Sequence, residues 1–281
     1  MKWVKLSNGI QIPAIGYGTF QIKPEHAKQW VLQALQAGYR LIDTAASYFN
    51  EKEIGEAIRQ SGIPRNEIFL TTKVWIQDAG YEKTLAAFEK SLERLQTDYI
   101  DLYLIHQPYG DYYGSWKAME KLYEQGKIKA IGVCNFDAAR LVDLTIHARI
   151  APMVDQVEFH PLFQERALRK AMPNTCVLEA WGPLNEGQRD IFHHRTLKQI
   201  ARKHDRSVAQ VILRWHVEQG GIAIPKAADL HHMEENLALF DFELDQEDKK
   251  QIEALDFGYS ELIDHANPMT VQCLNRFTIH E

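Results

Sequence analysis

Residues 24–43 read PEHAKQWVLQALQAGYRLID and contain a helical pattern that leads directly into a strand. After Pro24, apolar side chains recur at helical spacing and form one face, which consists of Ala27, Trp30, Val31, Ala34 and Leu35. Gly38 predicts the end of this helix. The apolar pair Leu41-Ile42 then predicts a short strand, and Asp43 follows it. This order of elements is typical of the repeating unit of a parallel α/β sheet.

The same alternation of short apolar runs and helical patterns continues through the chain. The strand-like runs cover residues 15–18, 41–42, 68–72, 100–105, 130–133, 154–157, 176–180 and 222–224. Eight parallel strands can close into a barrel. Near the start, two further runs flank Asn8-Gly9, which strongly favours a β-hairpin, and from about Asp256 the periodicity is weak. We therefore predict an α/β fold: a (β/α)8 TIM barrel forming a single domain over residues 1–281, with an N-terminal β-hairpin and an irregular C-terminal tail.

Composition and charge narrow the class of protein. The chain is 45% hydrophobic and 25% charged, which is ordinary for a protein with a large core, and its net charge of −6 provides no basic field for nucleic acid. The three cysteines form no CxxC pair, so neither a metal site nor a disulfide framework is expected. The first residues lack the apolar core of a signal peptide, and no stretch reaches membrane-spanning length. We expect a cytoplasmic protein without membrane or nucleic-acid partners.

Polar residues follow several predicted strands at the point where each strand ends. Asp43, Lys73, His106 and Asn135 come directly after such runs, and Gln156 lies within one. In a (β/α)8 barrel these strand ends converge on one mouth, where the active site forms. Each residue also has an ordinary structural interpretation. Asp43 could cap a turn, Lys73 could be a solvated lysine at a strand end, and His106 could hydrogen-bond a turn. Tyr48, which lies shortly after Asp43, could be a half-buried aromatic. Their combination favours a shared functional role.

The chemistry of this set can be argued from side-chain properties. A free tyrosine has a pKa of about 10, which is too high for an efficient acid, and a nearby ammonium lowers it. Lys73 can act in this way on Tyr48, and Asp43 can hold Lys73 in position. Neutral His106 can donate a hydrogen bond to a carbonyl oxygen. Because no side chain supplies hydride, a nicotinamide cofactor would complete a carbonyl reduction. The Rossmann fingerprint is absent, because Gly16-Tyr17-Gly18 is followed by Gln at position 21, so a nucleotide must be held in another way.

With these residues in view, the sequence resembles the aldo-keto reductase family almost from end to end. The resemblance rests on ordered motifs, which are residues 38–45 leading to Tyr48, residues 98–106, residues 131–136, and residues 224–226 through Glu235-Asn236. It implies a catalytic tetrad of Asp43, Tyr48, Lys73 and His106, with Tyr48 as the proton donor and His106 orienting the substrate. It also implies NADPH as cofactor.

The resemblance further implies which residues bind this cofactor. Asn135 and Gln156 match the residues that hold the nicotinamide carboxamide, Cys134 stands where the family has serine, and Trp181 stands where it usually has a stacking tyrosine. The remaining expected contacts are Gly18, Thr19, Asp43, Gly182, Leu184, Lys226, Ala227, His232, Glu235 and Asn236. At the adenosine end the family has Lys-Ser and later Arg, whereas this chain has Lys226, Ala227 and His232. We therefore expect NADH to be accepted too, with a weak NADPH preference that rises at acid pH as His232 protonates.

The resemblance also bears on the substrate. The segments Gln107–Gly114 and Asn185–Phe192 are short and should overhang the barrel mouth, which predicts an open pocket as in the microbial diketogluconate and glyoxal reductase branch. The tail near Tyr259–Asn267 is expected to help close the site. The expected pocket walls are Phe20, Trp75 and Gln107, beside Tyr48 and His106. This predicts a monomer that reduces small carbonyls, α-dicarbonyls or keto sugars.

Two alternatives remain open on the sequence. Lys73 could form a Schiff base, as in barrel aldolases. The chain could also be a barrel that binds a cofactor without catalysing a reaction, although such a protein would have no need of the complete tetrad.

Overall fold

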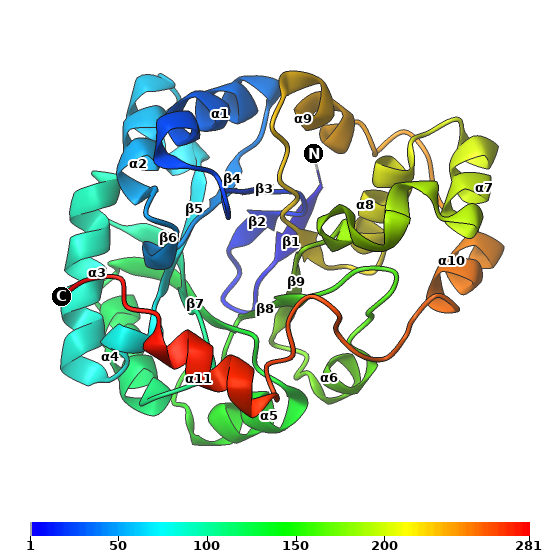
Figure 1. Cartoon of the computed structure of the whole chain (residues 1–281). Helices are drawn as coiled ribbons and strands as arrows, with labels where there is room; N and C mark the ends of the chain where they lie inside the picture. The colour runs from blue at the N-terminus through cyan, green and yellow to red at the C-terminus, as the bar shows by residue number, and fades with distance from the viewer. Residues whose placement is uncertain (1) are drawn as a thin grey trace.

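The computed structural model describes residues 2–281 and contains an eight-stranded parallel sheet. The strands lie side by side in the order in which they occur in the chain (Figure 1). They are β3 (Tyr17–Gly18), β4 (Leu41–Asp43), β5 (Phe69–Val74), β6 (Ile100–Ile105), β7 (Ile128–Cys134), β8 (Val154–Glu158), β9 (Val177–Trp181) and β10 (Ile222–Ala223). Each predicted strand is therefore present, with bounds that differ by a few residues.

The sheet closes on itself between β3 and β10. Ile15 and Ala223 form a parallel bridge, and the Gly16 amide donates to the carbonyl of Ala223 over 2.9 Å. The Gly18 amide continues this seam by donating to the carbonyl of Pro225 over 3.1 Å. These bonds join the first strand to the last, which confirms the predicted barrel. The antiparallel hairpin of β1 (Trp3–Lys5) and β2 (Gln11–Pro13) is also confirmed.

Helices surround the barrel, as Figure 1 shows. Those that follow strands β3 to β10 in the chain are α1 (Pro24–Ala37), α2 (Glu51–Gln60), α3 (Tyr81–Leu95), α4 (Tyr112–Glu124), α5 (Ala138–His147), α6 (Arg166–Ala171), α7 (Arg195–His204), α8 (Val208–Glu218), α9 (Leu230–Leu237) and α10 (Gln246–Glu253). The predicted face of α1 packs inward, with Trp30 half-buried at its edge. Gly38 ends α1 at φ 112°, a left-handed conformation that suits glycine.

The C-terminal tail runs across the barrel mouth. It is irregular as predicted except for α11 (Pro268–Arg276), which lies in front of the barrel in Figure 1. No residue of α11 is buried, so the sequence carries little apolar periodicity from which to predict this helix. The indole nitrogen of Trp75 donates to the carbonyl of Phe277 over 2.7 Å, and the Tyr109 hydroxyl donates to that of His265 over 2.7 Å. Barrel side chains thus hold the tail over the mouth.

Two further features concern membrane contact and thiols. Within residues 2–281, no helix is both long enough and apolar enough to cross a membrane. The three cysteines are all free thiols: Cys134 and Cys176 are buried, and Cys273 is exposed on α11.

Candidate active site

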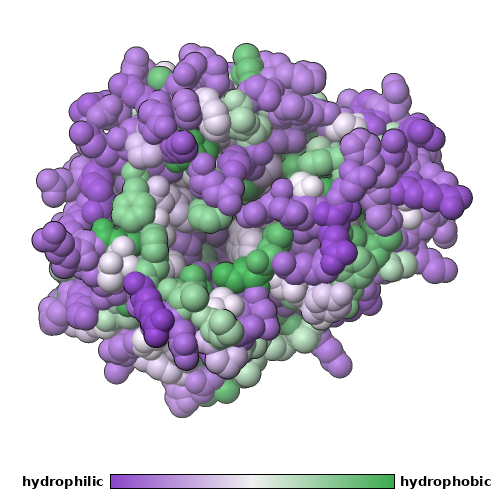
Figure 2. Space-filling view, viewed as in Figure 1, coloured by the Kyte–Doolittle hydropathy of each residue, from purple (hydrophilic) through white to green (hydrophobic). Residues whose placement is uncertain are grey.

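A cavity of about 1340 Å³ lies at the carboxyl ends of the strands, beneath the tail. It appears as a depression near the centre of the face shown in Figure 2. Thirteen of the residues expected from the sequence line it: Gly18, Phe20, Asp43, Tyr48, Trp75, His106, Gln107, Asn135, Gln156, Trp181, Gly182, Leu184 and Lys226. The convergence expected from the strand ends is therefore present.

Lys73 lies under this cavity on β5, with none of its side chain exposed. Its ammonium donates to Asp43 Oδ1 over 2.6 Å, to the carbonyl of Thr44 over 2.9 Å and to the Tyr48 hydroxyl oxygen over 3.3 Å. A lysine ammonium has three N–H donors, so each has a partner. Burial by itself lowers the pKa of Lys73, but Asp43 and then Tyr48 raise it, and the net shift is upward. Lys73 is therefore a fixed cation, and it does not provide the neutral amine that Schiff-base chemistry needs.

Tyr48 ends a short 3-10 helix, Ala46–Tyr48, and its ring is half-buried. Because the Lys73 ammonium donates to the Tyr48 oxygen, the phenolic hydrogen must point elsewhere, and the side chain lines the cavity. The expected lowering of the Tyr48 pKa needs correction: burial raises it above 10, and Lys73 opposes this only in part. Desolvation of the phenolate outweighs the ammonium in this pocket. Tyr48 therefore remains a protonated phenol at neutral pH.

His106 follows β6 and packs edge-on against the Tyr48 ring, with ring centroids 5.5 Å apart. Burial, followed by the charge of Lys73 and the proximity of His265, holds the pKa of His106 well below 6.5. The imidazole is thus neutral, in agreement with the prediction from the sequence. Its Nδ1 lies 3.2 Å from the Ser47 hydroxyl. A Ser47 hydroxyl that donates to Nδ1 leaves the ring proton on Nε2.

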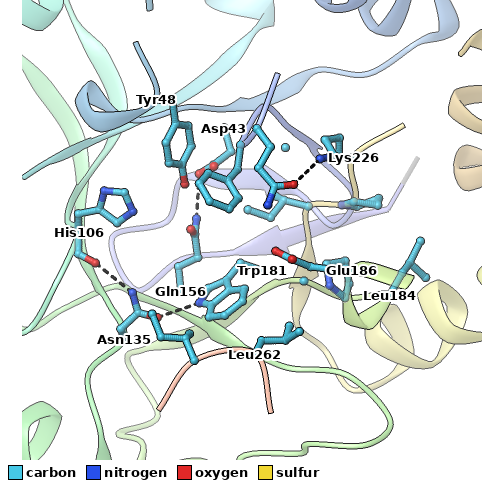
Figure 3. Close-up of a pocket in the computed structure, with 18 of the residues that line it drawn as sticks. Asp43, Tyr48, His106, Asn135, Gln156, Trp181, Leu184, Glu186, Lys226 and Leu262 are labelled. Atoms are coloured by element: carbon cyan, nitrogen blue, oxygen red, sulfur yellow. Dashed lines mark hydrogen bonds between the residues drawn. The ribbon is translucent and has the colours of Figure 1, made fainter. Parts of the chain in front are cut away.

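Asn135 and Trp181 are linked across the floor of the cavity, as Figure 3 shows. The Trp181 indole N–H donates to Asn135 Oδ1 over 2.8 Å, and Asn135 Nδ2 donates to the carbonyl of His106 over 3.0 Å. Asn135 has a left-handed backbone at φ 61°, a conformation that asparagine tolerates better than most residues. The Trp181 indole is therefore fixed by a bond through its own N–H.

Gln156 on β8 stands between two buried carboxyl groups. Its Nε2 donates to Asp43 Oδ2 over 2.8 Å and to Glu179 Oε2 over 2.9 Å. Glu179 on β9 is fully buried and was not expected from the sequence, because a single glutamate within an apolar strand gives no signal of its own. Its partner in the parallel ladder is Gln156, which places both side chains on the same face of the sheet.

Several expected cofactor contacts lie outside the lining of the cavity. Thr19 and Cys134 are buried beneath it, and the Thr19 hydroxyl donates to the carbonyl of Asp43 over 2.8 Å. The others are in or near α9, which starts after the capping residue Asp229: they are Ala227, His232, Glu235 and Asn236. His232 Nδ1 lies 2.5 Å from Asp229 Oδ2. Their contacts with a cofactor stay predictions.

The rim of the cavity includes three residues that the sequence did not single out for the site: Arg189 and Glu261, which lie in segments expected near the mouth, and Gln21. Arg189 in the β9–α7 loop forms a two-point ion pair with Glu261 in the tail, and one of its bonds measures 2.7 Å. Gln21 accepts a hydrogen bond of 2.8 Å from the Lys226 ammonium. Long polar side chains on loops give no periodic signal, so these cross-cavity contacts depend on the closed fold.

The sequence profile described as the Aldo/keto reductase family matches residues 14–256. The chain belongs to the aldo/keto reductase family. This aldo/keto reductase is 52% identical over 255 residues to a glyoxal reductase of Bacillus subtilis, which covers 90% of this chain and 92% of that protein. An aldo-keto reductase from a Medee basin deep-sea metagenome library, MGS-M4, superposes with a TM-score of 0.91 at 46% identity, covering 94% of this chain and 98% of that one.

A further solved relative, a substituted form of Gox0644 in complex with NADPH, superposes with a TM-score of 0.86 at 38% identity, covering 91% of this chain and 93% of that one. The resemblance read from the motifs is thereby confirmed. The chain is an aldo/keto reductase and so an oxidoreductase of carbonyl compounds. Neither the aldolase nor the non-catalytic alternative finds support among these relatives.

Proposed function

We propose that this enzyme uses NADPH to reduce small aldehydes, ketones and α-dicarbonyls, with Tyr48 as the proton donor. The main support is the position of Lys73, whose ammonium donates to the Tyr48 oxygen while Asp43 and Thr44 hold its other two hydrogens. This arrangement leaves the phenolic hydrogen free for a substrate in the cavity. It also places a cation where negative charge develops on the phenol.

The residues around the cavity fit a nicotinamide ring. Within residues 2–281, no hydrogen bond reaches Oε1 of Gln156, although the residue is almost fully buried and lines the cavity. A free acceptor at this point suits the N–H groups of a carboxamide. The Trp181 ring, fixed through Asn135, offers a flat apolar surface for stacking. Lys226 supplies positive charge for the phosphate end.

The proposed chemistry then assigns a role to each side chain. The bound nicotinamide supplies hydride to the carbonyl carbon. The neutral His106 imidazole donates a hydrogen bond to the carbonyl oxygen from Nε2, and Tyr48 transfers its proton to that oxygen as negative charge develops. Lys73 stabilises the resulting phenolate, and Asp43 keeps Lys73 in place.

The preference for small substrates is supported by the walls and by similarity. Trp75 packs edge-on against His106 with ring centroids 5.1 Å apart, and Phe20 packs against Tyr48 at 5.0 Å. These rings narrow the space beside the proposed reacting oxygen. The similar Bacillus subtilis protein is a glyoxal reductase, which favours α-dicarbonyls. We further propose a cytoplasmic monomer, as expected from the sequence.

A spectrophotometric assay of NADPH oxidation tests this function directly. Oxidation of NADPH is followed at 340 nm with methylglyoxal or a nitrobenzaldehyde, for the wild type and for Tyr48→Phe. Loss of a positioned general acid is expected to lower kcat by about 10²- to 10⁴-fold, while NADPH binding stays intact because the ring remains. Equal rates for the two proteins would remove Tyr48 from the reaction, and no oxidation by the wild type would contradict the function itself.

A further inference from the structure

Glu179 is a buried carboxyl group to which the proposed reaction assigns no part. It lies inside the barrel on β9, and none of its surface is exposed. Within residues 2–281 its Oε1 has no hydrogen-bond partner, so its known interaction is through Oε2 with the Gln156 amide. A buried polar atom without a partner costs free energy, and an apolar side chain of similar size would avoid this cost. What the carboxyl group contributes is an acceptor for Gln156.

This acceptor changes the behaviour of the Gln156 amide. The Nε2 group has two hydrogens, and Asp43 and Glu179 each accept one. Turning the amide over would place Oε1 against the Asp43 carboxylate, which has no hydrogen to donate, and would take both amide hydrogens away from the oxygens that accept them. The amide is therefore held with Oε1 away from the carboxyl groups, on a residue that lines the cavity.

The charge of Glu179 is compatible with this arrangement. Burial, and then the nearby charge of Asp43, raise the pKa of Glu179 to about 8. At neutral pH it is mainly a neutral carboxylic acid, whose carbonyl oxygen still accepts from an N–H. The barrel interior thus avoids a second full negative charge beside Asp43 while the acceptor is kept.

We propose that Glu179 is a positioning residue for the cofactor: by accepting from the Gln156 amide, it fixes Gln156 Oε1 as the acceptor for the nicotinamide carboxamide. This inference rests on the proposed function, because it requires a nicotinamide in the cavity. Glu179 does not touch the reacting atoms. It determines how well the site distinguishes a carboxamide from a group of similar shape that has no N–H.

The test compares NADP⁺ with its 3-acetylpyridine analogue, in which a methyl ketone replaces the carboxamide. The dissociation constant of each is measured by quenching of tryptophan fluorescence, which requires no turnover. We expect the wild type to bind the analogue roughly tenfold more weakly, since the buried Gln156 acceptor loses its donor. In Glu179→Leu, we expect this ratio to fall roughly threefold or more towards one, mainly because NADP⁺ binding weakens.

Glu179→Gln is the matched control, because its side-chain carbonyl replaces the accepting oxygen without a charge, and it should keep the wild-type ratio. If Glu179→Leu does not fold, Glu179→Ala provides the same comparison with a smaller side chain. A wild-type ratio retained in the leucine or alanine variant would overturn the proposal, and so would a wild-type ratio near one. Both results leave the proposed function standing if the wild type still oxidises NADPH with a carbonyl, whereas absence of NADP⁺ binding contradicts that function.

Discussion

The three hydrogen bonds of the Lys73 ammonium determine what its neighbours can do. A buried cation with every donor occupied cannot turn towards a substrate, so its influence on the proposed reaction passes through the Tyr48 oxygen. The pKa of the tyrosine is raised by burial, so the phenol keeps its proton across the physiological range. The proposed acid is therefore present in its protonated form before a carbonyl binds, and the ammonium acts only when charge develops.

At His106, the depressed pKa predicts a pH effect on stability. The unfolded chain takes up a proton near pH 6.5, whereas folded His106 stays neutral, so folding loses stability as the pH falls below about 6.5. His106→Gln removes this titration. We expect the difference in Tm between wild type and His106→Gln to shift in favour of the variant between pH 8 and pH 5, as measured by thermal unfolding. A constant difference would show that His106 protonates equally well in both states.

The residues expected at the adenosine end of the cofactor bear on the choice between NADPH and NADH. Ala227 has no hydroxyl, and His232 lies against the Asp229 carboxylate, which offsets any positive charge on the ring. We therefore expect a weak NADPH preference. Installing Ala227→Ser and His232→Arg together should raise the ratio of kcat/KM for NADPH over NADH by about 10- to 100-fold, the value of a charge-assisted hydrogen bond. An unchanged ratio would mean that the 2′-phosphate lies elsewhere.

Among the elements, the C-terminal tail contributes to the cavity more than to the core. It supplies Leu262, His265 and Phe277 to the cavity lining, yet α11 buries no residue. A segment that packs on one side only, and through few side chains, can be removed without exposing the interior of the barrel.

Truncation after Tyr259 tests this division of roles. The shortened protein keeps Asp256, whose side chain accepts from the backbone N–H of Gln164. Because this contact with the barrel is retained, we expect a Tm within a few degrees of that of the full chain. The KM for small carbonyls should rise severalfold because one wall is missing, while bulkier aldehydes should be turned over relatively better. Steady-state kinetics on a series of aldehydes of increasing size provides the measurement. A truncated chain that fails to fold would show that the tail is part of the core.

Some of the elements could be predicted from the sequence and others could not. The strands were predictable because strands buried on both faces appear as short apolar runs, and α1 because its apolar residues recur at helical spacing. The strand-end polar residues were predictable because parallel strands share an orientation. Helix α11 and the Arg189–Glu261 pair were not, since exposed residues obey no such period. Glu179 was missed for another reason: whether a lone glutamate in a strand is buried depends on its neighbour in the ladder, here Gln156.

For the whole molecule, the seam between β3 and β10 is the part of the barrel formed by the shortest strands. Each of these strands has two residues, whereas β5 and β6 have six each. The chains approach closely here, since a Cβ added to Gly18 would lie 2.7 Å from the carbonyl oxygen of Ile224. Closure of the barrel therefore depends on a residue without a side chain.

Gly18→Ala is expected to lower the free energy of unfolding by about 1–3 kcal/mol, because the backbone of the neighbouring strand must move. Gly221→Ala is the comparison: a Cβ there would lie 3.1 Å from the carbonyl oxygen of Leu178, a milder contact than that at Gly18, so the loss should be smaller. Urea unfolding of the two variants and the wild type provides the values. A larger loss for Gly221→Ala would contradict the importance of the Gly18 contact.

The distribution of thiols has a practical consequence for studying motion. Two of the three are enclosed, and the third, Cys273, sits on the helix that crosses the entrance. A maleimide dye should therefore label this enzyme at one position without any engineered cysteine. Its emission, followed in a stopped-flow instrument as coenzyme is mixed in, would report whether the entrance rearranges before, during or after loading.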